Sequence, residues 1–336
     1  MDNEFTMTQH SPDSCITDVA GIEVGHFTET RRPTGCTVVI TRAGAVAGVD
    51  VRGAAPGTRE TDLLSPTNLV DKVHAVLLAG GSAWGLDAAA GVMRWLEEQG
   101  IGLEVGPGRI PIVPAAVLFD LYLGDTRIRP DAQAGYAACA AASRSKAAQG
   151  NVGAGAGAVI GKIFGAERAM KGGIGSASLS VNGITMGALI ACNALGDVVD
   201  PFTQKIIAGA RTPDGRSFLD SRRALLAGEP PKRLVPGTNT TIGIIATDAV
   251  LTKAQATRLA TVGHDGYARS INPAHTMLDG DALFALGTGA SGRSGDMMVL
   301  ATMAAEVVAI AVARAARAAR AVTEGGLHLP AAGDMQ

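Results

Sequence analysis

The sequence predicts a layered α+β or α/β domain in which at least part of the sheet is antiparallel. The chain has 336 residues, of which 47% are hydrophobic, so it can bury a large core. Runs with the apolar content of strands are intermixed with runs that keep helical spacing. Asn182-Gly183, between two strand-like runs, is a two-residue hairpin signal and favours antiparallel pairing.

The charge balance excludes several classes of partner. The chain carries 29 basic and 31 acidic residues, a formal net charge of −2. No run of Lys or Arg suits a phosphate backbone, so we expect neither nucleic acid nor a membrane surface as a partner. The polar N-terminus lacks the apolar core of a secretory signal, and we therefore expect a cytoplasmic protein.

Glycine is abundant, with 44 residues set among Val, Ile, Leu and Ala. Two interpretations remain open: a tightly packed sheet with many sharp turns, or backbone that approaches a ligand or another backbone closely. The 4 cysteines form no CxxC pair, and the 6 histidines form no HxH or HxxxH pair. We expect no metal and no cofactor.

The first part of the chain predicts a tail, then strands, then a helix. Residues 1–14 are expected to form a flexible tail. The strand-like runs are Gly35–Ile40, Ala45–Val51 and Val73–Leu78. A helix is predicted from Ser82 to Gln99, because its apolar positions keep helical spacing and Gly100 follows as a stop signal.

The later part of the chain predicts an exposed excursion followed by buried elements. Residues 203–238 are polar and rich in Pro, Gly and Arg, which indicates an irregular segment with room for one short helix. The elements predicted after it are a strand from Thr240, a helix over Lys253–Val262, a strand over Ala282–Leu286 and a long helix over 297–313. Glu306 interrupts this last apolar run and three arginines follow the run, so the pattern indicates a buried helix rather than a membrane span.

Three glycine-containing motifs fail on spacing. Gly153–Lys162 does not form a phosphate-binding loop, because Ala156 replaces the first glycine and Ile163 replaces the Ser or Thr that binds magnesium. The dinucleotide fingerprint GxGxxG fails in the same segment, where Ile160 replaces the third glycine. Gly80–Gly85 is not a GxSxG elbow, because its last glycine comes one residue late.

Thr240 opens a strand directly after the excursion. One interpretation is purely structural, because Thr favours strands and Asn suits the end of a loop. The same layout fits a specific chemistry. If the chain breaks between Asn239 and Thr240, the new α-amino group, with a pKa of roughly 8, can act as the base that activates the Thr240 hydroxyl. The break itself would be intramolecular, by attack of that hydroxyl on the Asn239 carbonyl.

Two other segments contain groups that such a site requires. Asp279 and Asp281 are two residues apart, so in extended backbone both point to one face, where they could orient the Thr240 hydroxyl and ammonium group; solvated carboxylates of a turn are the alternative. Lys162 and Asn193 each stand alone in an apolar run. A buried Lys needs an anionic partner or a functional reason. Asn193 could donate to an oxyanion or simply end a strand.

Eight segments from about residue 16 onward carry a family resemblance. They are Ile16–His26, Thr34–Val39, Gly53–Leu64, Leu77–Val92, Asn151–Ala158, Lys171–Ser178, Asn239–Ala249 and His275–Gly289. Together they resemble the P1 or DmpA-type peptidases, a family of N-terminal-nucleophile-like hydrolases that includes β-aminopeptidases and nylon-oligomer hydrolases. Ile110–Asp125 and the Asn239-Thr240 junction look most like the branch of 6-aminohexanoate-oligomer endohydrolases.

The resemblance implies a fold and a maturation step. The fold is a four-layer αββα sandwich that forms a single hydrolase domain over residues 15–336. The domain is cut into chains 1–239 and 240–336, and the resulting pairs assemble into larger homo-oligomers.

The resemblance also implies the site and the activity. Thr240 is the nucleophile, Asp279 and Asp281 are its supporting carboxylates, and Lys162 and Asn193 are further active-site residues. A substrate-binding tyrosine is expected where Phe119 stands, and Tyr122 is the nearest candidate for that role. The implied reaction is hydrolysis of linear amides such as 6-aminohexanoate oligomers. Two alternatives are an aminopeptidase acting on short peptides and a non-processing relative that only binds a small ligand.

Overall fold

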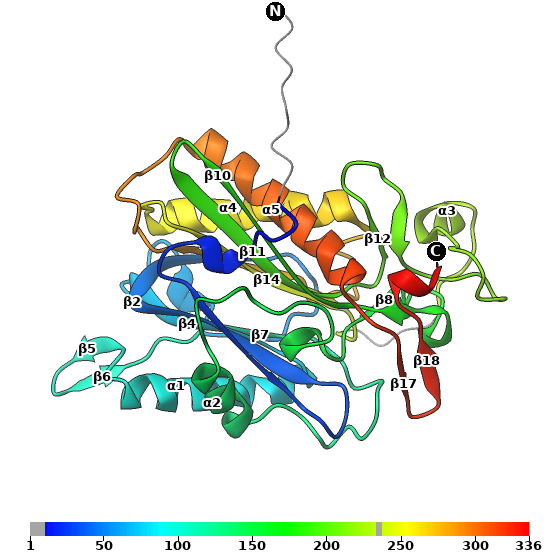
Figure 1. Cartoon of the computed structure of the whole chain (residues 1–336), viewed down its shortest axis with the longest axis horizontal. Helices are drawn as coiled ribbons and strands as arrows, with labels where there is room; N and C mark the ends of the chain where they lie inside the picture. Colours follow the sequence, from blue (N-terminus) through cyan, green and yellow to red (C-terminus); the bar gives the residue numbers. More distant parts are fainter. Residues whose placement is uncertain (1–10, 233–236, 336) are drawn as a thin grey trace, which may run out of the picture.

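The computed structural model describes residues 11–232 and 237–335, and in this part of the chain the central element is a 9-stranded sheet (Figure 1). In spatial order the strands are β10 (Gly173–Val181), β11 (Ile184–Asn193), β14 (Thr240–Thr247), β16 (Ala282–Gly287), β2 (Gly35–Val51), β4 (Lys72–Ala79), β7 (Ala115–Val117) and β3 (Thr58–Arg59), with β1 (Glu23–Thr28) paired to β2. The β14–β16 and β4–β7 pairs are parallel, and the other neighbouring pairs are antiparallel.

Strand β2 belongs to both halves of this sheet. Residues 35–40 pair with β1, and residues 46–51 pair with β16. Between these parts the register with β4 shifts between Ile40 and Ala45, and Gly44 has a φ of 74°. The two strands predicted here are therefore one long strand, which connects two half-sheets.

The two half-sheets pack face to face, with helices on their outer faces. Successive side chains of one strand pack in different cores, because they point to opposite faces of the sheet. Leu189 and Ile244 belong to the central core with Val76 of β4. Ile190 and Ile245 belong to the outer core beneath α4 and α5. This burial on both faces explains why the strands are continuously apolar in sequence.

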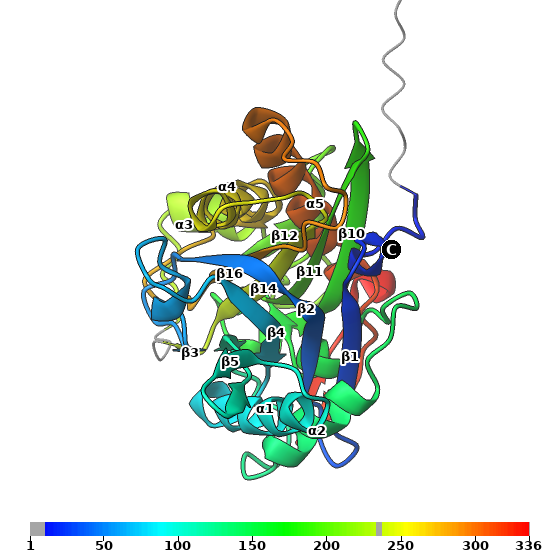
Figure 2. The ribbon, with the colours of Figure 1, turned by 90° about the vertical axis from the view of Figure 1, so that its left-hand side faces the viewer.

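The outer layers are two pairs of helices, which lie on opposite sides of the strands in Figure 2. They are α4 (Lys253–Ser270) with α5 (Met297–Arg317), and α1 (Ala88–Glu98) with α2 (Ala132–Ala140). The first pair packs on β10, β11, β16 and the second part of β2, and the second pair packs on β1, β2 and β4. The result is the expected αββα order of layers.

The predicted elements agree with the structure in kind and differ at their ends. The hairpin at Asn182-Gly183 is confirmed, with φ values of 53° and 77° that suit a type I′ turn. The helix predicted from Ser82 begins as a 3-10 turn over Ser82–Asp87 and becomes α1 only at Ala88. Helix α4 continues beyond the predicted end at Val262 to Ser270.

The remaining elements are short. A small sheet holds β12 (Asp197–Val199), β13 (Ile206–Ala208) and β15 (Ile271–Asn272), and three hairpins pair β5 (Leu103–Val105) with β6 (Gly108–Ile110), β8 (Val159–Ile160) with β9 (Met170–Lys171), and β17 (Val322–Glu324) with β18 (Leu327–Leu329). The excursion at 203–238 contains β13 and α3 (Ser221–Leu226). Its residues 233–236 and most of the predicted tail, residues 1–10, lie outside the described residues.

Helix α5 was predicted to be buried. By length and composition it is the one helix, among those the structure describes, that could cross a membrane, but 61% of its most apolar window is buried inside the molecule. Its buried face includes Val308 and Val312, which lie in the outer core with Met186 of β11. The helix therefore serves as a layer of the sandwich.

Candidate active site

The strand β14 carries Thr240 at its first position, between β11 and β16. Asn193 is the register partner of Thr240 on β11, and Asn239 forms an isolated bridge with Asp279, just before β16. Thr240 is 2% exposed and Asn239 is fully buried. The sheet thus brings together segments that lie far apart in the sequence.

The two threonines at this junction point to opposite sides of the sheet. Ile242, two residues after Thr240, lies in the central core between the half-sheets. Gly243, two residues after Thr241, faces Tyr267 of α4. Because side chains alternate along a strand, Thr240 points toward the central layer and Thr241 toward α4.

The peptide group before Thr240 is held in a defined geometry. The Thr240 hydroxyl donates to the carbonyl oxygen of Asn239, and the Gly280 amide donates to the same oxygen at 2.9 Å. A Cβ at Gly280 would lie 2.8 Å from the Thr240 Oγ1 and 2.7 Å from the Ala55 carbonyl oxygen, so glycine is required for this close approach. A backbone amide aimed at a carbonyl oxygen is the arrangement that stabilises a developing oxyanion.

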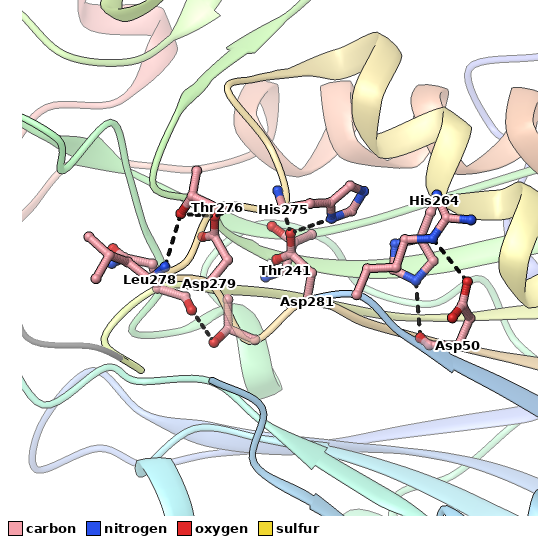
Figure 3. A network of polar contacts seen from close by, with 11 residues as sticks. Asp50, Thr241, His264, His275, Thr276, Leu278, Asp279 and Asp281 are labelled. Carbon is pink, nitrogen blue, oxygen red and sulfur yellow. Dashed lines mark hydrogen bonds and ion pairs between the residues drawn. The ribbon is translucent and has the colours of Figure 1, made fainter. Parts of the chain in front are cut away.

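The two carboxylates are hydrogen-bonded to the segments around the junction (Figure 3). Asp281 accepts from the Thr241 amide at 2.7 Å and from His275 Nδ1 at 2.9 Å. Asp279 accepts from the Thr276 amide at 2.8 Å and from its hydroxyl at 2.6 Å. Among the hydrogen bonds of the described residues, none joins either carboxylate to the Thr240 hydroxyl.

Asp279 is buried beside a second carboxylate. Burial, followed by the charge of Asp281, raises the pKa of Asp279 to about 6. Asp279 is therefore partly protonated near neutral pH. Its hydrogen bonds to Thr276 and its attraction to Lys162 oppose this shift.

Lys162 and Asn193 form a buried pair. The Lys162 Nζ donates to the Val159 carbonyl at 2.5 Å, to the Asn193 carbonyl at 2.8 Å and to Asn193 Oδ1 at 2.9 Å. Burial lowers the pKa of Lys162 to about 7, although Asp279 acts to raise it. Of the two explanations that the sequence left open, an anionic partner or a functional reason, the first is not met by a direct contact: the hydrogen-bond partners are neutral oxygens, and Asp279 acts through its charge.

Phe119 and Tyr122 differ in their relation to the cavity beside Thr240. The Phe119 carbonyl accepts from Asn193 Nδ2 at 3.1 Å, which links it to the register partner of Thr240. The rings of Phe119 and Tyr122 meet edge to face, with centroids 5.0 Å apart. Phe119 lines the cavity beside Thr240, whereas Tyr122 is not among the described lining residues.

The cavity beside Thr240 has a volume of about 220 Å³. Its described lining comes from the loop after β2, the 3-10 turn that begins at Ser82, the end of β7 with the two residues after it, and the segment that leads into β14. The residues are Ala55, Pro56, Gly57, Ser82, Ala83, Val117, Leu118, Phe119, Gly237, Thr238 and Thr240. None of these side chains is charged. Ser82 adopts a φ of 56°, a left-handed conformation that is uncommon for a residue other than glycine and is frequent at functional sites.

Sequence reasoning did not single out Gly280 or His275, which contact the groups around the Asn239-Thr240 junction. Gly280 acts through its backbone amide, which no side-chain pattern reveals. His275 lies in the same segment as the two aspartates, but it matches no metal-ligand spacing. Among the residues that the structure describes, no group of three or more His, Cys, Asp or Glu side chains is placed to hold a metal ion.

Comparison with known proteins matches the chain to a family. The family model of peptidase family S58 matches residues 14–328. An uncharacterized aminopeptidase of Mycobacterium tuberculosis is 48% identical over 293 residues, which cover 82% of this chain and 81% of the relative. A 6-aminohexanoate-oligomer endohydrolase of Paenarthrobacter ureafaciens is 31% identical over 274 residues, which cover 81% of this chain and 74% of the relative.

A solved structure supports the fold. The L-aminopeptidase D-Ala-esterase/amidase of Ochrobactrum anthropi, described as a variant of the N-terminal-nucleophile hydrolase fold, superposes with a TM-score of 0.70 at 22% identity and covers 96% of this chain and 92% of its own. The expected fold class is therefore confirmed. Of these relatives, the mycobacterial aminopeptidase shares more of its sequence with this chain than the endohydrolase does.

Proposed function

The chain belongs to peptidase family S58 and is a hydrolase of amide bonds, and from this premise we propose that it cuts itself before Thr240 and then uses Thr240 as its nucleophile. The observation that carries the proposal is the contact of the Asn239 carbonyl oxygen with both the Thr240 hydroxyl and the Gly280 amide. The nucleophile and an oxyanion donor thus meet at one peptide bond.

The self-cleavage step is an acyl shift followed by hydrolysis. The Thr240 oxygen attacks the Asn239 carbonyl carbon, and the negative charge on the carbonyl oxygen is stabilised by the Gly280 amide. The C–N bond breaks, the hydroxyl proton passes to the leaving nitrogen, and an ester joins Asn239 to the Thr240 oxygen. Water then hydrolyses this ester, which leaves a carboxylate on Asn239 and a free amine on Thr240. The mature protein would consist of chains 1–239 and 240–336.

Turnover would repeat the same chemistry on a substrate. The free α-amine of Thr240, with a pKa of roughly 8, takes the proton of its own hydroxyl. The Thr240 oxygen attacks the substrate carbonyl, and the α-ammonium group returns the proton to the leaving nitrogen, so that the C–N bond breaks, the amine leaves and an acyl-enzyme remains. Water then hydrolyses the ester, which releases the acid and restores the Thr240 hydroxyl. Asn193 supports this step because its amide group has two N–H donors, of which one binds the Phe119 carbonyl at 3.1 Å. We assign the other, which no hydrogen bond among the described residues uses, to a substrate oxygen.

Lys162, the second buried polar group, holds the Asn193 side chain in one orientation. Lys162 binds both Asn193 Oδ1 and the Asn193 carbonyl. Since Oδ1 is held by the Lys162 Nζ and by the Val159 amide, the amide nitrogen must point the other way. Lys162 therefore fixes which end of the Asn193 side chain acts as a donor. We assign Asp279 and Asp281 to the same site, because Asp279 forms a bridge with Asn239 before the junction and Asp281 binds the Thr241 amide after it.

The cavity supports a neutral, linear acyl group as the substrate. A group that enters beside Thr240 meets uncharged side chains among the described lining residues. A charged ammonium there would lose hydration without an ionic partner among the described lining residues. An internal segment of a 6-aminohexanoate oligomer fits this chemistry, and the endohydrolase relative at 31% identity acts on such oligomers by name.

Removal of N-terminal residues from short peptides is the second candidate. It is favoured by the relative at 48% identity, which is named as an aminopeptidase. The two candidates differ in whether the substrate amine must be free.

Assays with free and N-acetylated 6-aminohexanoate oligomers separate these candidates. An endohydrolase accepts both, and the acetylated oligomer should be cleaved at a rate within about tenfold of the free one. Loss of activity on the acetylated oligomer alone would favour the aminopeptidase. Thr240→Ala serves as the control for background hydrolysis. Size-exclusion chromatography of the mature protein tests the further expectation that the cleaved pairs assemble into homo-oligomers.

A further inference from the structure

A cluster of aromatic side chains lies behind the nucleophile strand, on the side of β14 that faces α4. His264 and Tyr267 come from α4, and His275 comes from the loop after β15. The His264 and His275 ring centroids are 4.8 Å apart, and those of His264 and Tyr267 are 5.2 Å apart. The proposed chemistry gives none of these three residues a role.

His275 makes two hydrogen bonds to one carboxylate oxygen. Its backbone amide lies 3.2 Å, and its Nδ1 lies 2.9 Å, from Asp281 Oδ2. An ionised carboxylate only accepts hydrogen bonds, so Nδ1 carries a proton in this contact. The Asp281 side chain is 3% exposed, so water competes little for these bonds.

The same Asp281 carboxylate also binds β14, the strand that carries Thr240. Its other oxygen, Oδ1, accepts from the Thr241 amide at 2.7 Å. The Thr241 amide belongs to the peptide group that follows Thr240 directly. His275 is therefore connected through a single carboxylate to the amide of Thr241, the residue after Thr240, and Figure 3 shows His275, Asp281 and Thr241 in this network.

The backbone at His275 is also unusual. Its φ of 57° is left-handed, which costs free energy for a residue with a Cβ. This conformation brings the amide and the ring nitrogen of one residue to the same carboxylate oxygen. Asparagine, aspartate and histidine are the residues other than glycine that adopt such a φ most often, so His275 can hold this conformation and still present its imidazole.

We propose that His275 is a positioning residue of the active site, which holds Asp281 against the Thr241 amide and so fixes the position of Thr240 for self-cleavage and turnover. The inference rests on the proposed role of Thr240. It assigns His275 a function that depends on the Nδ1–H donor rather than on ring packing.

Three substitutions at His275 separate the hydrogen bond from the backbone conformation. His275→Asn keeps a side-chain N–H donor at the place of Nδ1 and tolerates a positive φ. His275→Gly tolerates the φ and keeps the backbone amide but has no side-chain donor. His275→Asp has the size of Asn but presents a carboxylate to Asp281. His74→Asn is the control for a histidine-to-asparagine change, because His74 lies on β4, outside the proposed site.

The measurements are the rate of self-cleavage on denaturing gels, kcat and KM, and the thermal unfolding midpoint. His275→Asn and His74→Asn should keep both rates within about threefold. His275→Gly and His275→Asp should lose roughly 10–100-fold in the rate of self-cleavage and in kcat, with KM changed less than about threefold. Wild-type rates in His275→Gly, or equal losses in Asn and Gly, would overturn the inference.

Two further outcomes are informative. If the Gly and Asp variants fail to fold while Asn folds, the hydrogen bond stabilises the fold and the positioning role is wrong. If the wild-type chain remains uncut and inactive, the proposed function itself fails, and this result is distinct from a His275 variant that behaves like the wild type.

Discussion

The amide nitrogen of Gly280 lies 2.9 Å from the carbonyl oxygen of Asn239, the residue that precedes the proposed cut. This contact crosses between two strands, because Asn239 extends β14 and Gly280 precedes β16. The parallel pairing of these strands sets the donor in place before any bond breaks. Preorganised donors of this kind need little rearrangement when charge develops.

Gly280→Ala should slow self-cleavage by about 100-fold or more. The added Cβ would lie 2.8 Å from the Thr240 Oγ1, so either the hydroxyl or the amide donor must move. The cut fraction on denaturing gels over time gives the rate. Gly108→Ala is the control, since a Cβ there meets nothing within 4 Å, and it should be cut like the wild type. Equal rates for the two variants would contradict the role of the Gly280 amide.

Thr240→Ala should stay whole, and its amidase activity should fall at least about 1000-fold. Thr241→Val should still be cut, because the Thr241 side chain points toward α4 and only its backbone amide binds Asp281. Intact mass and turnover of an oligomer substrate provide the two measurements. The reverse result, with Thr241→Val uncut and Thr240→Ala cut, would place the nucleophile one residue later.

The stability of the chain should depend on pH through Lys162. Its pKa is about 7 in the folded state and 10.5 when unperturbed, so between these values the unfolded chain binds more protons. The free energy of unfolding should therefore rise with pH across this window, by on the order of 1 kcal/mol per pH unit, and stay flat with respect to this group below it.

Lys162→Met removes this dependence and is best measured in the Thr240→Ala background, where cutting does not interfere. Chemical denaturation from about pH 6 to about pH 10 compares the two proteins. The unfolding free energy of the protein with Lys162, minus that of the protein with Met at this position, should become more positive as the pH rises. Lys171, whose pKa burial also lowers to about 7, is present in both proteins and cancels. A difference that is independent of pH would show that Lys162 titrates normally.

Ala83→Phe should raise KM by about tenfold or more and leave self-cleavage within about threefold of the wild type. Ala83 lines the cavity of about 220 Å³ beside Thr240, and a phenyl ring would fill much of it. Self-cleavage involves only the chain itself and does not need this space. Ala90→Phe, on the exposed side of α1, is the control. An unchanged KM in Ala83→Phe would show that the substrate binds elsewhere.

Local patterns in the sequence predicted most of the elements. The hairpin at Asn182-Gly183 could be recognised because its turn requires positive φ at two successive positions. The continuity of β2 could not, because the shift between Ile40 and Ala45 looks like the end of one strand and the start of another. The continuity of β2 through this shift depends on its pairing with β4 and β16, which local sequence does not encode.

The site was predictable only as a set of residue types. Lys162 and Asn193 could be singled out as lone polar residues in apolar runs, and Thr240 as the start of a strand after the excursion. Asp279 and Asp281 stood out by their spacing, and family resemblance joined all five into one site. Their contacts depend on register, which places Asn193 opposite Thr240. The Gly280 amide leaves no side-chain signal, and the φ of 57° at His275 follows from the fold around it.

The intact mass of the purified chain after storage tests the central claim most directly. Self-cleavage before Thr240 predicts two masses, those of residues 1–239 and 240–336, with threonine at the N-terminus of the smaller chain. A single mass for the full chain, together with undiminished amidase activity, would contradict the account.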